Sequence, residues 1–321
     1  MVLMNRIETI GVDLGGTKLA VGVVDDQRET GWSNVVPSKG YSQGEVVDLL
    51  AEQINMAQRQ HPGVAAAGLG IPAALDFERG FAISTANLPL EDVPVRDMLE
   101  EKVDVPVFID NDGNVAMLAE ALYGAARGTK NALLLTLGTG IGGGIWIDGK
   151  LFRGSRGAGA ELGHTVVEID GPRCSCRGGR GCIEVFASGN AIGKAGQEAA
   201  ERVPDSALGQ MAVTGQPISG REVTAAALGG DEEAIAVIEM AGHYLGNALV
   251  SLSNIFQPEV IVVGGGAMAM GDLILEPARK ELRERALRPM DQTRVVAAEL
   301  GPEAGMIGAA AMARIEMEGT A

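Results

Sequence analysis

Three cysteines and a histidine lie close together near the middle of the chain. Cys174, Cys176 and Cys182 are the only cysteines of the protein, and His164 lies ten residues before the first of them. Three thiolates and one imidazole are the ligand set of a closed, four-coordinate structural zinc site. Glycines between the second and third cysteines let the backbone turn tightly there. The spacing therefore predicts a structural Zn²⁺ site.

The cysteines also admit two interpretations that involve no metal. Buried cysteines often behave as small apolar core residues. Core packing, however, does not require all of them to lie within nine positions of a Gly- and Arg-rich segment. A disulfide would leave one thiol unpaired, and Cys174 and Cys176 are too close in sequence to pair comfortably. The metal site is therefore the favoured interpretation.

A dense run of polar residues follows the apolar stretch Val105 to Ile109, which we expect to be a buried strand. The run is Asp-Asn-Asp-Gly-Asn at positions 110–114, and an Ala- and Leu-rich helix begins there. One Asp or Asn would be enough to cap that helix. Four polar side chains in five positions exceed that need. A carboxylate at the carboxyl end of a strand is well placed to act as a general base, and we favour that role.

A Gly-rich turn joins the apolar stretches Ile7 to Leu14 and Leu19 to Val24, which together indicate a β-hairpin. Asp13 lies at the end of the first strand. The backbone N–H groups of such a turn can bind a phosphate, with Asp13 near a bound Mg²⁺. An ordinary Gly-rich hairpin is the alternative. The turn residues are Gly15, Gly16, Thr17 and Lys18.

The same plan of strand, glycine turn and strand recurs between Asn131 and Ile147. Its turn contains Gly138, Thr139 and Gly140, and Asp148-Gly149 then predicts a tight hairpin turn. Neither glycine turn is a Walker A loop or a GxGxxG motif that opens a helix. Two such turns facing each other would grip a polyphosphate from both sides.

The rest of the chain alternates helical and strand patterns, as in an α/β protein. Helical periodicity covers Gly44 to Gln60 and Asp231 to Ile255, and a closing small-residue helix is expected over Gly305 to Met317. Glu259 to Val263 is an apolar strand that runs into three glycines, whose bare backbone permits close approach of an adenosine or a phosphate. These glycines are Gly264, Gly265 and Gly266.

Composition bounds the class of protein. The 321 residues, 46% hydrophobic and 21% charged, fit a globular protein of about two domains. The net charge of −16 argues against nucleic acid and anionic membranes as partners. We expect no signal peptide and no apolar run long enough to span a bilayer. Clustered cysteines without a wider framework suit a reducing cytosol, so a cytoplasmic protein is expected.

Taken together, these motifs resemble those of sugar kinases of the ROK family (repressor, open reading frame, kinase), in the superfamily of actin, hexokinase and the heat-shock chaperone ATPases. The resemblance covers nearly the whole chain. Asn111-Asp112 is similar to the catalytic Asn-Asp pair of the family. The other matches are Asp13 to Lys18 and Leu137 to Gly144 for the two phosphate motifs, Gly264 to Gly266 for the adenosine motif, Glu161 to His164 for the sugar-binding ExGH motif, and Cys174 to Glu184 for the zinc motif with its following sugar-binding Glu.

The resemblance implies an α/β fold of two ribonuclease-H-like domains around a cleft, as in actin-like ATPases, each with a mixed five-stranded sheet. Residues 1–115 would form the smaller domain, to which the final helix, about 302–321, returns. Residues 116–301 would form the larger domain with the zinc loop. Closure of the cleft on sugar would exclude water as a competing phosphoryl acceptor. A homodimer, or a tetramer, is implied in the same way.

The resemblance also assigns roles. Asp112 would accept the proton of a sugar 6-hydroxyl while that oxygen attacks the γ-phosphate of ATP, and Asp13 would hold Mg²⁺ through water. The zinc would be structural, with His164 binding it through one ring nitrogen and a hydroxyl through the other. Sugar hydroxyls, which both donate and accept, would be bound by Asn87, Asn111, Asp112, Glu161, His164 and Glu184.

Two positions depart from the family pattern. Five residues, rather than four, separate Cys176 from Cys182, which puts the zinc geometry and the placement of Glu184 in question. Ala73 stands where the family usually has glycine, and its methyl group would narrow the sugar pocket.

Three functions remain open at this point. An ATP-dependent glucose 6-kinase is favoured. A kinase for fructose, mannose, N-acetylglucosamine or N-acetylmannosamine is the second, because such pockets use much the same residues. The third is a sugar-sensing repressor, against which the early start of the phosphate hairpin and the acidic charge both argue. Polyphosphate in place of ATP is a further variant of the donor.

Overall fold

The computed structural model describes residues 6–85, 88–176 and 179–319. The chain forms two compact units. The first comprises Met1–Gly128, Gly144–Ala160 and Glu299–Ala321, and the second comprises Thr129–Gly143 and Glu161–Ala298. The expected domain boundary near residue 115 stays a prediction, because compactness alone does not show which segments fold independently.

The first unit is built on a five-stranded sheet of order β3-β2-β1-β4-β7. β2 is antiparallel to β1 and β3, whereas β4 is parallel to β1 and β7. The expected hairpin is confirmed, since β1 and β2 pair from Thr9↔Val24 to Leu14↔Leu19 and enclose the first glycine turn. The strands are β1 (Thr9–Leu14), β2 (Lys18–Val24), β3 (Thr30–Pro37), β4 (Ala67–Ile71) and β7 (Val107–Asn111).

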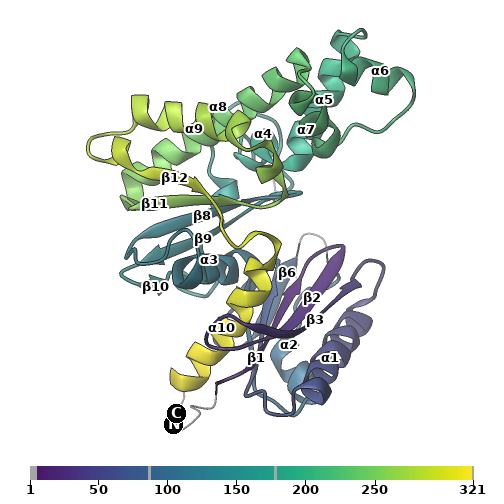
Figure 1. Ribbon diagram of the computed structural model, residues 1–321, viewed down its shortest axis with the longest axis vertical. Coiled ribbons are helices and arrows are strands. Elements are labelled where there is room, and N and C mark those ends of the chain that lie inside the picture. Colours follow the sequence, from purple (N-terminus) through teal and green to yellow (C-terminus); the bar gives the residue numbers. More distant parts are fainter. Residues whose placement is uncertain (1–5, 86–87, 177–178, 320–321) are drawn as a thin grey trace. The chain divides into compact units, whose positions relative to one another are not determined.

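Successive side chains of β1 point to opposite faces of the sheet, and this alternation determines the face on which Asp13 lies. Ile10, Val12 and Leu14 are fully buried in the core formed with α1 (Gln43–Gln60) and α2 (Val95–Glu100). The intervening residues therefore point to the opposite face, which α3 (Asp112–Tyr123) and α10 (Ala304–Gly319) cover (Figure 1). A Cβ on Gly11 would lie 1.9 Å from the Met306 carbonyl oxygen, so α10 rests directly on the strand backbone. Asp13 shares this face.

The second sheet has the order β10-β9-β8-β11-β12 and repeats the plan of the first. β8 is parallel to β11, which is parallel to β12, whereas β9 and β10 are antiparallel. Asp148 and Gly149 both have positive φ between β9 and β10, so the expected tight turn is confirmed. The strands are β8 (Ala132–Leu137), β9 (Ile141–Ile147), β10 (Lys150–Leu151), β11 (Val260–Gly264) and β12 (Arg294–Ala297). The expected pair of five-stranded mixed sheets is confirmed.

The second unit also holds a helical layer, in which α8 is the longest element (Figure 1). Ser219 and Glu222 form a capping box at the start of α7. Among the described helices, α8 alone is long and apolar enough to cross a bilayer by length and composition, which is weak evidence for a span, and 44% of its most apolar window is buried. The helices are α4 (Glu184–Ala187), α5 (Gly189–Arg202), α6 (Ala207–Val213), α7 (Gly220–Leu228), α8 (Glu232–Phe256) and α9 (Asp272–Arg285).

Candidate active site and metal centre

The expected catalytic turn lies where β7 ends and α3 begins. Asn111 is the N-cap of α3, and its Oδ1 accepts the N–H of Gly113 at 2.8 Å. Its Nδ2 donates to the carbonyl oxygen of Ala73 at 3.2 Å. The capping interpretation of the polar run is thus correct for one residue of the run, and Asp112 is left as the carboxylate at the first helical position.

The carboxyl group of Asp112 has the character of a base. Burial raises its pKa above the ordinary value, and the Gly113 N–H, which donates to Oδ1 at 2.9 Å, opposes that shift. A carboxylate whose pKa is moved toward neutrality is better suited to accept a proton in a reaction near pH 7.

Asp13 lies close enough to Asp112 for their charges to interact. Burial raises the pKa of the Asp13 carboxyl from 3.8 to about 6, the charge of Asp112 adds to the rise, and Lys18 opposes it. Repulsion between two nearby carboxylates is relieved by a hard divalent cation, for which carboxylate oxygens are preferred ligands. This pair therefore fits Mg²⁺ in its donor chemistry.

The first glycine turn is held by a residue that the sequence patterns did not reveal. The N–H of Gly15 donates to the carbonyl of Lys18 at 2.9 Å, which closes the turn. Ser38 Oγ donates to the carbonyl of Gly15 at 2.6 Å, and the Ser38 N–H donates to the carbonyl of Thr17 at 3.1 Å. Because Ser38 follows β3, no local spacing connected it with the turn.

The second glycine turn is fixed from two sides within the second unit. The Gly138 carbonyl accepts the N–H of Gly189 at 2.8 Å. The N–H of Ile141 donates to Glu184 Oε2 at 2.8 Å, and a Cβ on Gly140 would lie 2.3 Å from the same oxygen. The structure therefore brings the expected sugar-binding Glu184 to the expected phosphate turn.

The three glycines after β11 meet the same end of the second sheet. Gly265 has φ of +90°, and a Cβ there would lie 2.4 Å from the Leu137 carbonyl oxygen. Only glycine combines that backbone conformation with that approach. The segment Gly264 to Gly266 thus lies beside the end of β8, next to the turn of Gly138, Thr139 and Gly140.

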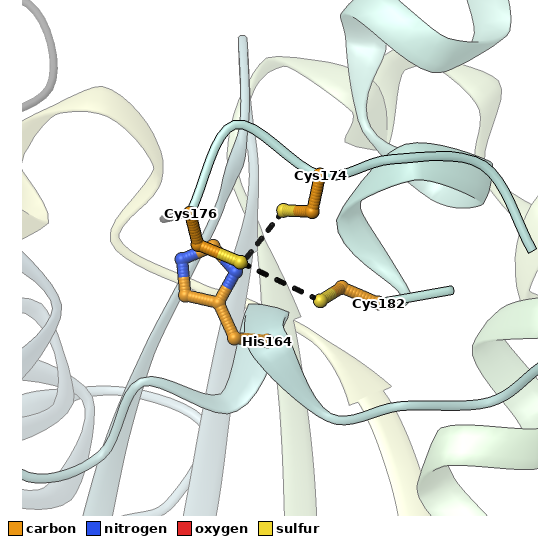
Figure 2. Close-up of side chains that lie close together, drawn as sticks. All are labelled: His164, Cys174, Cys176 and Cys182. Carbon is orange, nitrogen blue, oxygen red and sulfur yellow. Dashed lines mark hydrogen bonds between the residues drawn. The ribbon is translucent and has the colours of Figure 1, made fainter. Parts of the chain in front are cut away.

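The cysteines and the histidine form a single cluster (Figure 2). The four potential ligand atoms all lie within 4.8 Å of one another. Cys174 Sγ is 3.6 Å from His164 Nδ1, and Cys176 Sγ is 3.8 Å from Cys182 Sγ. The edge of a tetrahedron with Zn–S bonds of about 2.3 Å is about 3.8 Å. The additional residue between Cys176 and Cys182 does not keep the ligand atoms apart.

The electrostatics of the cluster favour a cation. Burial raises the pKa of the Cys182 thiol to about 12, with the neighbouring thiols adding to the rise, and burial also raises the pKa of Cys176. A bound divalent cation reverses this effect by stabilising the thiolates. The donor set of three sulfurs and one nitrogen fits zinc.

The remaining expected sugar ligands lie near this cluster. Glu161 precedes the 3₁₀ helix Leu162–His164, and a Cβ on Gly163 would lie 2.0 Å from the Ile141 carbonyl oxygen, so the helix rests on the start of β9. Glu184 lies 3.9 Å from Cys174 Sγ. The second unit therefore brings the ExGH segment, the metal cluster and the glycine turn together. Asn87 lies outside the described residues.

Comparisons with known proteins agree with this arrangement. The model of the ROK family matches residues 9–316. A glucokinase of Streptomyces coelicolor is 36% identical over 95% of this chain and 97% of its own. The solved structure of a ROK family glucokinase from Streptomyces griseus, in complex with glucose and AMPPNP, has a TM-score of 0.86 at 36% identity and covers 96% of this chain and 99% of its own. A putative xylose repressor of Caldicellulosiruptor sp. is 30% identical over 96% of this chain and 78% of its own. The chain therefore belongs to the ROK family and has its actin-like ATPase fold.

Proposed function

We propose that this protein is an ATP-dependent glucokinase, which transfers the γ-phosphoryl group of ATP to the 6-hydroxyl of glucose. The observation that carries the proposal is the half-buried Asp112 at the β7–α3 turn, with its raised pKa and with Asp13 close by. The similarity to glucokinases over nearly the whole chain supports glucose as the acceptor and ATP as the donor.

The chemistry assigned to the first unit is proton transfer and binding of the metal–nucleotide. Asp112 takes the proton of the 6-hydroxyl while the sugar oxygen bonds to the γ-phosphorus and ADP leaves. Asn111 binds a sugar hydroxyl beside it. Asp13 would hold Mg²⁺, which when bound would neutralise phosphate charge. The turn of Gly15 to Lys18 offers backbone N–H groups to the phosphates.

The second unit is assigned recognition of sugar and nucleotide. Glu161, His164 and Glu184 bind sugar hydroxyls, with Asn87 as a further ligand from the first unit. Gly138 to Gly140 bind phosphate through the backbone, and Gly264 to Gly266 accept the adenosine. His164 and the three cysteines would hold a structural Zn²⁺, which would orient the His164 ring so that its other nitrogen binds a hydroxyl.

The test is an ADP-release assay with Mg-ATP and a panel of glucose, fructose, mannose, N-acetylglucosamine and N-acetylmannosamine. We expect the highest kcat/KM with glucose. Highest turnover of another hexose would keep the mechanism and overturn the acceptor. Polyphosphate replaces ATP in a second series, in which formation of the sugar phosphate is measured because no ADP is released, to test the donor.

A sugar-sensing regulator is the second candidate, because the repressor relative is similar over 96% of this chain. Glucose binding by calorimetry without turnover of any sugar, in folded and zinc-loaded protein, would favour it.

The cytoplasmic location and the homodimer stay predictions, and size-exclusion chromatography with light scattering tests the latter.

A further inference from the structure

A buried carboxylate directly precedes the Asn111-Asp112 turn. The side chain of Asp110 is fully buried. Its Oδ1 accepts the backbone N–H of Asn111 at 2.7 Å and Nδ2 of Asn114 at 2.8 Å. Its Oδ2 accepts Nε–H of Arg153 at 2.6 Å. The Asp110 carboxylate therefore binds Asn111 and Asn114, which lie on either side of Asp112. It also binds the guanidinium of Arg153, which lies 43 residues away in the chain.

Arg153 is itself held in place from two further sides. Its guanidinium lies over the ring of Phe77, 3.8 Å from the ring centroid. Its Nη2 lies 3.2 Å from Oε1 of Glu316 on α10, and its side chain is 21% exposed. A planar, forked guanidinium can stack and make separate bonds through Nε and Nη2, whereas a lysine ammonium group offers a single point charge.

The energetics of burial connect Arg153 to the turn. A buried carboxylate stays ionised only where a cation and hydrogen-bond donors compensate the loss of water. With Arg153 in place, both oxygens of Asp110 are fixed acceptors. Without it, Oδ2 of Asp110 would lose its donor, the carboxylate would turn toward water, and its bonds to Asn111 and Asn114 would weaken. The first turn of α3, where Asp112 sits, would then lose its external support.

We propose that Arg153 positions the proposed base Asp112 by holding the carboxylate of Asp110 in the orientation that binds Asn111 and Asn114, an inference that rests on the proposed kinase function. Arg153 and Asp110 are positioning residues, since the contacts that carry the argument are to the turn and not to a reacting atom. The placement of a reacting group matters strongly, because a displacement of about 1 Å can cost about 100-fold in rate.

The experiment compares Arg153→Met with Arg79→Met. Arg79 is a matched control in the same unit, because its guanidinium also lies over a phenylalanine ring, 5.0 Å from the Phe81 centroid. Unlike Arg153, Arg79 is exposed. We expect Arg153→Met to lower kcat about 100-fold and to change KM for ATP less than about 3-fold. Arg79→Met should keep wild-type kcat.

A double variant separates positioning from a general structural role. Asp110→Asn combined with Arg153→Met removes the uncompensated charge but keeps an oxygen that can accept from Asn111 and Asn114. We expect it to recover at least about 10-fold of the kcat lost in Arg153→Met, because an unpaired buried charge costs more than the absence of the pair. If the double variant is as slow as Arg153→Met, the proposal is overturned.

Hydrogen–deuterium exchange supplies a readout that does not depend on activity. Peptides spanning residues 107–118 should exchange at least about 10-fold faster in Arg153→Met than in wild type or Arg79→Met, and should recover in the double variant. Unchanged exchange there would overturn the proposal even if kcat fell. If Arg153→Met does not fold, Arg153→Lys serves instead, with the same expected directions. Wild-type protein inactive on every sugar would contradict the glucokinase proposal, while the exchange series would still test the support of the turn.

Discussion

The two glycine hairpins share a topology but differ in the last residue but one of the first strand. β1 and β8 are both six-residue strands, and the fifth residue is Asp13 in one and Thr136 in the other. Burial raises the pKa of Asp13 to about 6. Thr136 brings no charge, and a Cβ on Gly142 would lie 2.6 Å from its Oγ1, so the hydroxyl packs against bare backbone.

The two turns also differ in where their neighbouring acidic residues come from. The first turn has its acid within its own hairpin and Asp112 nearby. The acid at the second turn, Glu184, comes from a different segment, which follows the three cysteines. A repeated topology thus fixes where a glycine turn lies, whereas the side chains around it decide its chemistry. The first unit brings two acids, Asp13 and Asp112, to its turn, whereas the turn of the second unit is held by Glu184 from a separate segment.

The strongest way to break this comparison is to remove the base from the first unit. Asp112→Asn should lower kcat about 1,000-fold, because a positioned general base contributes about 10²–10⁴-fold. The measurement is the ADP-release assay at saturating glucose. Asp104→Asn, which replaces an exposed aspartate of the same unit, should behave as wild type. Turnover of Asp112→Asn close to that of wild type would place the base elsewhere.

The next prediction concerns the loop of the second unit that carries the three cysteines. Cys182→Ser should lose the equivalent of one Zn²⁺ per chain by elemental analysis and about 3 kcal/mol in free energy of unfolding, the contribution of a ligand present at about 100 times its Kd. Chemical unfolding followed by circular dichroism measures the loss. Asp112→Asn should keep its zinc, since it leaves the ligands intact. Zinc-free wild-type protein of undiminished stability would refute the structural role.

The features that could be predicted from the sequence are those carried by local spacing. The hairpins follow from apolar runs interrupted by glycines, and the cluster from cysteines close together in sequence. β3 was not predicted, because its residues are exposed or half-buried at this edge of the sheet and show no continuous apolar run. The hairpin of β5 (Ala73–Asp76) and β6 (Phe81–Thr85) and the helices α5 and α6 were also not predicted.

The supports of the candidate site were harder still to predict. Ser38 lies 23 residues from Gly15, and Arg153 lies 43 residues from Asp110. Hydrogen bonds between segments so far apart depend on how the sheet and its helices pack, and no periodicity of the local sequence encodes them. The glycine turns could be located in advance, whereas the side chains that hold them could not.

The pH dependence of stability sharpens the contrast between Asp13 and Thr136. Because the carboxyl pKa is about 6 in the folded protein and 3.8 as its ordinary value, the unfolded chain binds fewer protons between these values. Stability from this group is therefore full below about pH 4 and falls as pH rises to about 6. Asp13→Asn should raise the free energy of unfolding by about 2 kcal/mol at pH 7 and by much less at pH 4.

Urea unfolding in magnesium-free buffer at the two pH values measures this difference. Thr136→Val is the matched control from the second hairpin, because it removes a hydroxyl without removing a charge. Its effect on stability should be the same at both pH values. An equal gain for Asp13→Asn at pH 4 and pH 7 would mean that burial does not hold the carboxyl of Asp13 protonated, and the contrast between the hairpins would lose its electrostatic basis.

The smallest expected effect tests whether the second turn works through its neighbour. Gly140→Ala would place a Cβ 2.3 Å from Glu184 Oε2, so the carboxylate must move and release the Ile141 N–H that it accepts at 2.8 Å. If Glu184 binds a sugar hydroxyl, KM for glucose should rise about 10-fold, the equivalent of about 1.4 kcal/mol. Gly44→Ala in α1, where a Cβ meets no atom within 4 Å, should leave KM for glucose and KM for ATP unchanged. A rise in KM for ATP alone would show that the second turn, like the first, acts on the nucleotide directly, and that its borrowed carboxylate takes no part in holding the sugar.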